Sequence, residues 1–180
     1  IWGPHDNHLL PRLIRRASSG RLRQIGSGEN VIDMVYVENA AHAQLQAADR
    51  LQAASPVAGR AYWITQGEQV NCWDWINRLL DCADLPAVKK SIPAGLAWSI
   101  GCCLETIYRV LSLPGEPGMT RFLARQLSTS HYFNGERARN DLWYLPRVST
   151  DQGLERLRLF LREQEAAGGS GDSPGDGSCL

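Results

Sequence analysis

The residues best suited to chemistry stand at the very start of the sequence. Ile1 and Trp2 form an apolar pair, a Gly-Pro turn follows them, and His5 and His8 flank two further polar residues. Two imidazoles three residues apart at the start of a helix can approach each other and bind a metal ion. No third ligand is obvious beside them. The sequence therefore predicts polar groups of a surface or of a substrate loop here, and no metal site.

The composition argues against several classes of function. The chain has 180 residues, with 19 lysines and arginines against 19 aspartates and glutamates, so nothing indicates a nucleic-acid partner. Hydrophobic residues make up 43%, which is typical of a globular protein. The five cysteines include no C-x-x-C pair, and we expect reduced, mostly buried thiols in a reducing compartment. The longest uncharged run, 91–104, is about 14 residues long and falls short of the ~20 that span a bilayer.

One stretch, residues 26–45, organises the elements that must position these groups. Gly26 and Gly28 supply turn geometry, and the apolar MVYV run at 34–37 predicts a short strand buried on both faces. Asn39 is the predicted N-cap of the alanine-rich helix that follows. A buried strand followed by a close-packing helix is a βα unit, so the sequence predicts an α/β protein.

The remaining elements are read from apolar periodicity and turn residues. Asn71, Thr120 and Asn134 are predicted helix caps. A domain over 1–165 and a disordered Gly/Ser-rich tail over 166–180 are expected, because the tail has too few apolar residues to order itself. The predicted helices are 8–17, 71–83, 93–113, two short ones after Thr120 and Asn134, and 149–165; the predicted strands are 22–25, 61–65 and 89–92.

Several segments together resemble a known family. IWGP is followed about thirty residues later by G-x-G and VYVEN, and then by AYWITQGEQVNCWDWINRLL and HYFNGERARNDLWYLPRVSTDQGLERL. This pattern, from Ile1 to about Arg162, resembles the C-terminal half of an extended short-chain dehydrogenase/reductase of the 3β-hydroxysteroid dehydrogenase/isomerase family, which includes sterol 4α-carboxylate 3-dehydrogenases. The resemblance implies the C-terminal portion of an extended Rossmann-type, NAD(P)-binding fold with a mostly helical substrate lobe.

Two features of that family are missing from the chain. It contains no Gly-rich dinucleotide fingerprint after a first strand, and no tyrosine has a lysine four residues later, since Lys89 and Lys90 are the only lysines. We therefore expect this chain to be the C-terminal part of a longer enzyme. The catalytic Tyr and Lys would lie upstream of Ile1, and the isolated chain is predicted to be inactive.

The resemblance also implies where the cofactor binds. It places Ile1 against the nicotinamide of NAD or NADP, with Gly3 and Pro4 turning the chain beside it. An apolar wall would exclude water from hydride transfer, and glycine would permit close backbone approach. Arg12 has two interpretations, a cation near the cofactor phosphates or part of a solvated helix face. The choice between NAD and NADP is not readable here.

The substrate class is indicated most sharply at Ile32. Relatives that act on nucleotide sugars usually place an arginine just before the aspartate of this segment, where it holds the diphosphate. An isoleucine there favours a hydrophobic substrate, and His5, Leu10 and Tyr36 are the other predicted substrate-side residues. We expect oxidation of a 3β-hydroxyl of a steroid-like, sterol-like or other hydrophobic alcohol. An NAD-dependent nucleotide-sugar epimerase or dehydratase, and a non-catalytic NAD(P)-binding interaction protein, remain alternatives.

The apolar helix expected at 93–113 bears on partners and location. It suits a core helix, a lid over a hydrophobic pocket, or peripheral contact with a membrane. A homodimer also stays open. The expected location is cytoplasmic, or membrane-associated on the reducing side.

Overall fold

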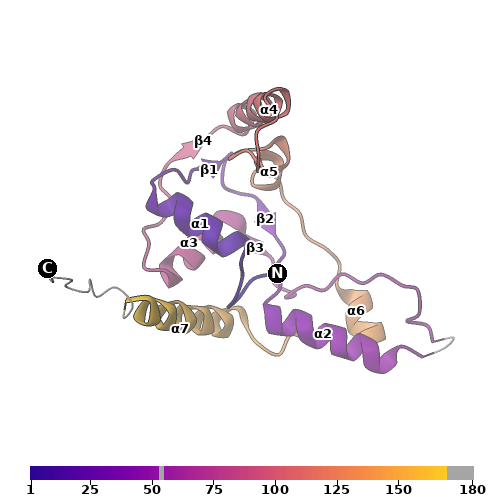
Figure 1. Ribbon diagram of the computed structural model, residues 1–180. Coiled ribbons are helices and arrows are strands. Elements are labelled where there is room, and N and C mark those ends of the chain that lie inside the picture. The colour runs from indigo at the N-terminus through magenta and orange to yellow at the C-terminus, as the bar shows by residue number, and fades with distance from the viewer. Residues whose placement is uncertain (53–54, 170–180) are drawn as a thin grey trace, which may run out of the picture.

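The computed structural model describes residues 1–52 and 55–169, which form short strands among helices (Figure 1). The elements are α1 (Leu9–Ser18), β1 (Gln24–Ile25), β2 (Val31–Ile32), α2 (Val37–Arg50), β3 (Val70–Asn71), α3 (Cys72–Cys82), β4 (Ser91–Ile92), α4 (Ala94–Val110), α5 (Arg121–Gln126), α6 (Glu136–Leu142) and α7 (Thr150–Gly169).

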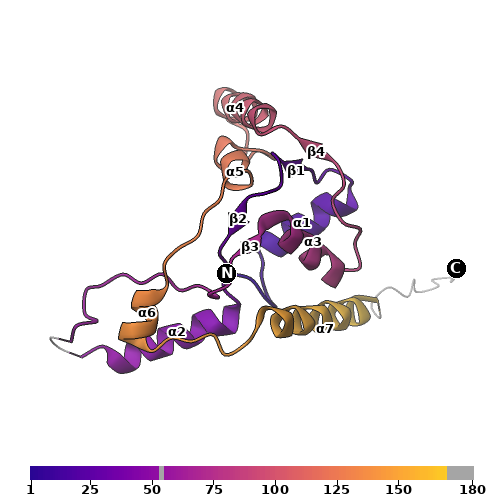
Figure 2. The same ribbon diagram turned by 180° about the vertical axis from the view of Figure 1, so that it is seen from behind.

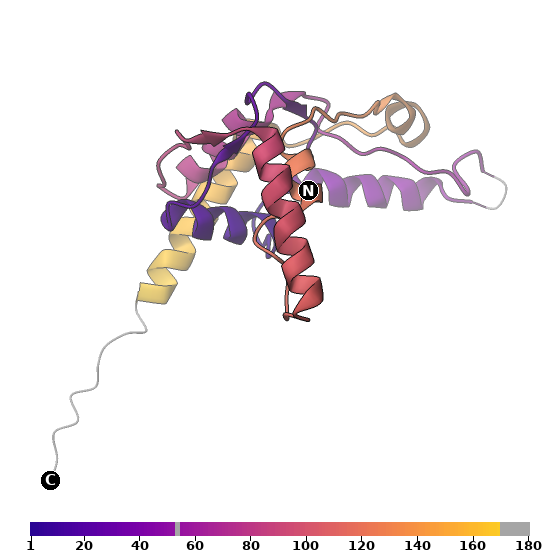
Figure 3. The same ribbon diagram turned by 90° about the horizontal axis from the view of Figure 1, so that it is seen from above.

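The helices form three groups, which are separate in both side views (Figures 1 and 2). α1, α3 and α7 surround the main core, α2 and α6 pack together at one end, and α4 with α5 occupies another end. Seen from above, α2 and α4 extend outward in different directions (Figure 3). β1 and β4 pair in parallel, and β2 and β3 pair antiparallel, so two small sheets connect the groups.

α3 shows how the sequence builds the core. Asn71 is its N-cap, as predicted: Oδ1 accepts hydrogen bonds from the backbone N–H groups of Trp73 at 2.9 Å and Asp74 at 3.1 Å. The Asn71 side chain also donates to the Gly28 carbonyl at 2.6 Å, which ties the cap to the glycine turn. The buried face is long and apolar; its members are Cys72, Trp73, Trp75, Ile76, Leu79, Leu80 and Cys82.

Removing this cap has a measurable consequence. Asn71→Ala should lower the free energy of unfolding by about 1–2 kcal/mol, because two backbone donors and the Gly28 carbonyl lose their partner. A urea titration of the intact protein measures the change. Asn140→Ala, at an exposed position of α6, is the control and should stay within about 0.5 kcal/mol. Equal effects of the two changes would contradict the cap.

The strands predicted at 34–37 and 61–65 are not present as regular elements. Residues 34–36 are extended, but they form only a single parallel bridge, between Trp2 and Tyr36, and α2 already begins at Val37. Residues 61–65 have no strand assignment at all. A strand requires a partner segment that pairs along its length. Among the described residues, only Trp2 and Gln66 bond to the backbone of 34–36 from distant parts of the chain, and no segment pairs with 61–65.

Asn39 is not a helix cap, and that prediction is wrong. α2 begins two residues earlier, with Tyr36 at its N-cap position, so Asn39 lies inside the first turn and is 1% exposed. Its amide instead holds together segments that are far apart in sequence. It donates to Gln66 Oε1 at 3.1 Å and to the Val148 carbonyl at 2.7 Å, and it accepts from the Arg147 and Val148 N–H groups.

Two predicted helix boundaries also change. α6 has Gly135 at its N-cap position without a side-chain cap, although Asn134 accepts a hydrogen bond from the Glu136 N–H at 2.7 Å. α7 runs to Gly169, so it includes the first residues of the segment predicted as a tail; 170–180 lie outside the described residues. In the part of the chain that is described, no helix combines the length and apolar character needed to cross a membrane.

Candidate functional site

The N-terminal turn and the start of α1 line a cavity of about 330 Å³. Four predicted site residues, Ile1, Gly3, Pro4 and His5, lie together in its wall. Ile1 is 77% exposed, so its side chain is free to contact a bound group. The structure thus brings together three of the four residues expected at the cofactor, with one of those expected at the substrate.

The turn is anchored by its neighbour, Trp2. The Trp2 N–H donates to the Val35 carbonyl at 3.1 Å, and the Val37 N–H donates to the Trp2 carbonyl at 2.9 Å. The indole packs edge-on against Tyr36 and Trp75, with ring centroids 5.1 and 5.8 Å away. Trp2 was not a predicted site residue, yet it fixes the position of the whole turn.

Gly3 is required in this turn for two reasons. Its φ of 144° lies in a region that side-chain-bearing residues rarely adopt, and a β-carbon would come within 2.7 Å of Val37 Cγ1 and 3.0 Å of Tyr36 Cε2. The backbone therefore passes directly over the start of α2. Such close approach leaves the other side of the turn, with Ile1 and Pro4, open to the cavity.

The start of α1 is occupied by Asp6, which the sequence analysis did not assign a role. Its Oδ1 accepts from the N–H groups of His8 at 2.8 Å and Leu9 at 3.0 Å, and Oδ2 accepts from Leu10 at 3.1 Å. A carboxylate at a helix N-terminus satisfies free donors and favours the local dipole. The signal was present as an Asp three residues before Leu9, the first apolar residue of the helical pattern.

Arg12 does not line this cavity. Its guanidinium is 2.7 Å from Glu116 Oε2, in an exposed ion pair that joins α1 to the segment between α4 and α5. This arrangement matches the interpretation of Arg12 as part of a solvated helix face. A role of Arg12 at the cofactor phosphates remains only a prediction. His5 has a φ of 64° and its ring packs on Phe160 of α7 at 4.5 Å.

The other predicted substrate residues are packed in the interior. Leu10 is 5% exposed and Ile32 is 8% exposed, and both belong to the main core. Ile32 pairs with Val70 across the β2–β3 sheet and bridges to His131. Neither residue lines the cavity at the Ile1 turn, and their contact with a substrate stays a prediction.

Tyr36 is fully buried, but its hydroxyl reaches a polar edge. It donates to Glu38 Oε1 at 3.3 Å, and burial, followed by the charge of Glu38, raises the pKa of the phenol. The phenol therefore keeps its proton at neutral pH.

Beside Ile32, burial raises the pKa of the Asp33 carboxyl, although the Phe133 and Met34 N–H groups donate to it and oppose the shift.

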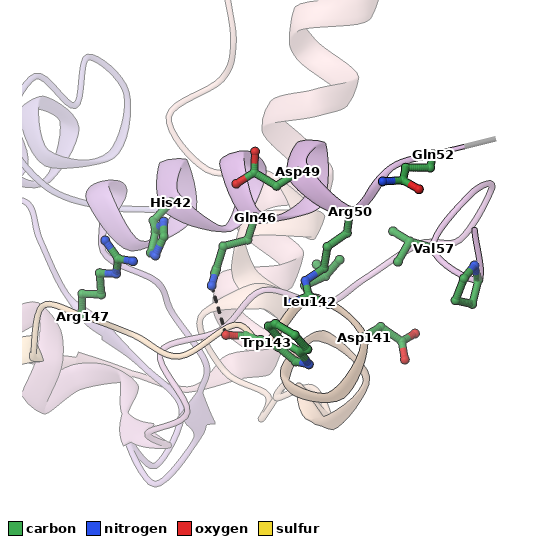
Figure 4. A pocket seen from close by; sticks show the side chains of 11 residues that line it. His42, Gln46, Asp49, Arg50, Gln52, Val57, Asp141, Leu142, Trp143 and Arg147 are labelled. Atoms are coloured by element: carbon green, nitrogen blue, oxygen red, sulfur yellow. Dashed lines mark hydrogen bonds between the residues drawn. The ribbon is translucent and has the colours of Figure 1, made fainter. Parts of the chain in front are cut away.

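A second cavity, of about 630 Å³, lies between α2 and α6 and contains no residue of the predicted sites (Figure 4). The Arg50 guanidinium stacks on Trp143, 3.2 Å from the ring centroid, and Gln46 donates to the Trp143 carbonyl at 3.0 Å. Trp143 has a φ of 56°, in the left-handed region, and it ends α6. Asp141 accepts hydrogen bonds from Tyr62 and Arg60, so its charge is already balanced.

The chemistry available in these two cavities is limited. Within residues 1–52 and 55–169, no cluster of three or more His, Cys, Asp or Glu side chains could hold a metal ion. The first cavity is walled on one side by the turn of Ile1, Gly3 and Pro4. A flat ring could pack closely against the backbone and apolar side chains of this turn, which would keep water away from the ring. The second is lined by side chains of both charges, of which Asp141 is paired with Arg60 and Arg50 is stacked on Trp143. The first is therefore the better candidate site.

Comparison of the sequence with known proteins finds a family model and relatives that agree with one another. The family model described as the 3-beta hydroxysteroid dehydrogenase/isomerase family matches residues 1–93. The 2-alkyl-3-oxoalkanoate reductase of Stenotrophomonas maltophilia (strain K279a) is 44% identical over 158 residues, 88% of this chain and 48% of that protein. The human (Homo sapiens) sterol-4-alpha-carboxylate 3-dehydrogenase, decarboxylating, is 33% identical over 165 residues, 90% of this chain and 44% of that protein. The chain spans about half the length of the curated relatives it matches.

Solved structures agree on the fold. A dTDP-glucose 4,6-dehydratase from Streptomyces venezuelae, with NAD bound, matches with a TM-score of 0.55 at 20% identity. The matched region covers 92% of this chain and 42% of the dehydratase chain. A UDP-glucose 4-epimerase from Thermotoga maritima has a TM-score of 0.55 at 18% identity, covering 91% and 44%. The predicted fold class, the C-terminal portion of an extended Rossmann-type fold, is confirmed.

Proposed function

Because this chain belongs to the 3-beta hydroxysteroid dehydrogenase/isomerase family, we propose that it is part of an NAD(P)-dependent oxidoreductase. The reaction interconverts a hydroxyl and a ketone at C3 of a hydrophobic substrate. A 3β-hydroxyl of a steroid-like or sterol-like alcohol is one form of that substrate. NAD or NADP supplies the hydride chemistry when bound. The residues of this chain bind and orient the substrate and the nicotinamide.

The activities for which the relatives are named support a narrower substrate class. A 2-alkyl-3-oxoalkanoate has its C3 oxygen on the carbon next to the one that bears the carboxylate. A sterol-4-alpha-carboxylate dehydrogenated at C3 has the same relation between oxygen and carboxylate. The shared pattern, a β-hydroxy or β-keto acid with large apolar groups, is the observation that carries the proposal. We infer this class for the intact protein.

The N-terminal turn would serve as the nicotinamide-side wall. The 330 Å³ cavity, the glycine that tolerates no β-carbon and the exposed Ile1 side chain fit the flat ring of a nicotinamide. Ile1 and Pro4 would exclude water beside the ring, and Trp2 would hold them in position. The structure gives no support for a site that would hold the phosphates of the cofactor, since Arg12, the cation expected there, is paired with Glu116.

The test is an assay of the intact protein. A 2-alkyl-3-oxoalkanoate with NADH or NADPH, and a 3β-hydroxysterol 4α-carboxylate with NAD or NADP, should each change the absorbance of the reduced nicotinamide. A UDP-sugar is the comparison substrate, because nucleotide-sugar epimerases and dehydratases share the fold. Turnover of the UDP-sugar alone would replace the proposal with that alternative. Cofactor binding without any turnover would favour a non-catalytic NAD(P)-binding protein.

Ile32→Arg should lower kcat/KM for the hydrophobic substrate at least tenfold, which corresponds to about 1.4 kcal/mol. The change places a charge where the side chain is 8% exposed among apolar neighbours. Ile32→Leu, which conserves volume, is the matched control and should retain activity. Thermal melting of both variants separates unfolding from a change in substrate binding. A gain in UDP-sugar binding by the arginine variant would instead favour the nucleotide-sugar alternative.

A further inference from the structure

The proposed substrate class makes two demands on the cavity at the N-terminal turn. A β-hydroxy or β-keto acid has its carboxylate attached to C2, next to the C3 that exchanges hydride with the nicotinamide. In a 2-alkyl-3-oxoalkanoate the same C2 also bears the alkyl chain. A site beside the nicotinamide therefore needs hydrogen-bond donors for an anion directly next to an apolar surface.

The backbone N–H groups at the start of α1 are not available to such a carboxylate. Asp6 already accepts hydrogen bonds from the N–H groups of His8, Leu9 and Leu10. These bonds also offset the charge of Asp6, the one acidic side chain among the described residues that line the cavity. Those lining residues include no lysine or arginine. A carboxylate bound in this cavity must therefore be met by other polar side chains.

Two side chains in the same wall remain free to donate. Asn7 and His8 are exposed, and within residues 1–52 and 55–169 neither side chain has a hydrogen-bond partner. An amide supplies two N–H donors, and an imidazole supplies one when neutral and two when charged. His5 also lines the cavity, but its ring packs on Phe160, with the ring centroids 4.5 Å apart. Asn7 and His8 are thus the available donors.

An apolar surface lies directly beside these donors. Leu9 follows His8 in the chain, is 39% exposed and lines the same cavity. Ile1 also lines the cavity and is 77% exposed, but its side chain is the one assigned to the nicotinamide. Leu9 is therefore left for the alkyl chain on C2. Positions 8 and 9 thus offer a donor and an apolar side chain, which matches the two substituents of C2.

We propose that Asn7 and His8 bind the substrate carboxylate, with Leu9 against the alkyl chain, and so determine the preference for acids over neutral substrates. The inference rests on the proposed function and deepens it, because it names how that site recognises its substrate. The carboxylate takes no part in hydride transfer: hydride passes between C3 and the nicotinamide, and a proton leaves or joins the C3 oxygen. Removal of its partners should therefore weaken substrate binding without removing the chemistry.

Kinetics of the intact protein with a matched acid and ester test this assignment. 2-Hexyl-3-hydroxydecanoate and its methyl ester, oxidised with NAD or NADP, differ only in the charged group. The native protein should have a KM for the acid about tenfold or more below that for the ester. His8→Phe keeps a flat ring without donors, and it should raise the KM of the acid about tenfold and change that of the ester less than about twofold.

Two further variants separate the donors from the shape of the wall. Asn7→Leu should also raise the KM of the acid and leave that of the ester nearly unchanged, because leucine has similar volume and no donor. His8→Gln retains an N–H donor, so it should keep more of the preference for the acid than His8→Phe does. The same comparison can be made with a 3β-hydroxysterol 4α-carboxylate and its methyl ester.

His42→Phe is the matched control. His42 lines the other cavity, between α2 and α6 (Figure 4), so its replacement should leave both KM values unchanged. Thermal melting verifies that each variant is folded. The affinity for NADH or NADPH, measured by nucleotide fluorescence, should be the same in His8→Phe as in the native protein, because the proposed contact is with the substrate.

The outcomes distinguish this inference from the proposed function. Equal KM values for acid and ester in the native protein would overturn the inference and leave the proposed function standing. A preference for the acid that neither His8→Phe nor Asn7→Leu reduces would overturn it too, because the carboxylate would then be bound elsewhere. Turnover of none of the acids and esters would overturn the proposed function and the inference together.

Discussion

Asn39→Ala should lower the free energy of unfolding by about 3 kcal/mol, the largest single effect expected in this protein. The Asn39 side chain makes four hydrogen bonds while 1% exposed, to Gln66 and to the backbone of Arg147 and Val148. Alanine would leave two backbone donors and one carbonyl without that partner in the interior. It would also loosen the contact between α2 and the chain that leads into α7.

A denaturant titration of the intact protein measures this effect, with Gln69→Ala as the control at an exposed neighbouring position. Gln66 shares the network, since its amide also donates to the Val148 carbonyl at 2.7 Å. The double change Asn39→Ala with Gln66→Ala should therefore cost less than the sum of the single changes. Strict additivity would mean that the two side chains act independently, contrary to the observed geometry.

Gly153→Ala should destabilise the protein by about 1–2 kcal/mol, although alanine is the better helix former. A β-carbon at this position of α7 would lie 2.8 Å from both Trp2 Cη2 and Tyr36 Cδ2. The clash would push Trp2, and with it the Ile1–Pro4 turn, out of place. The same variant should bind NAD(P) more weakly if that turn contacts the nicotinamide.

Gly95→Ala is the matched control for this prediction. Gly95 is also in a helix, but nothing lies within 4 Å of a β-carbon there, so the same substitution should stabilise α4 by about 0.5–1 kcal/mol. Thermal melting gives both stability changes, and near-ultraviolet circular dichroism reports on the Trp2 environment. If Gly153→Ala also stabilises the protein, α7 does not pack on Trp2 and Tyr36 as described.

Local signals were sufficient for several features. Asn71 is a helix cap because its amide oxygen reaches N–H groups two and three residues away, and no distant segment takes part in those two bonds. Thr120 caps α5 in the same way, through the Leu123 N–H at 3.0 Å. The turn at Gly3 and the run of apolar residues in α4 were equally visible. The joint pattern of short segments was also enough to identify the family.

The strands were misjudged because a strand depends on neighbours that its own residues do not encode. The MVYV segment has the composition of a buried strand, and Trp2 and Gln66 do bond to it, from either side. Each contributes only one or two hydrogen bonds, so the segment is extended without forming a regular sheet. The apolar residues at 61–65 have the right composition too, and in the described chain no segment pairs with them.

The sequence by itself determined the family, the fold class, most helices and the turn that lines the candidate site, because each of these is written in residues close together in the chain. Only the tertiary structure decided how individual side chains are used. Asn39 joins distant segments instead of capping a helix, Arg12 pairs with Glu116, and Ile32 packs in the core. On α4, Ala97 and Gly101 are buried, whereas Ile100 and Ile107 are exposed. These outcomes depend on partners up to about a hundred residues away, and local sequence patterns carry no record of which distant residues meet.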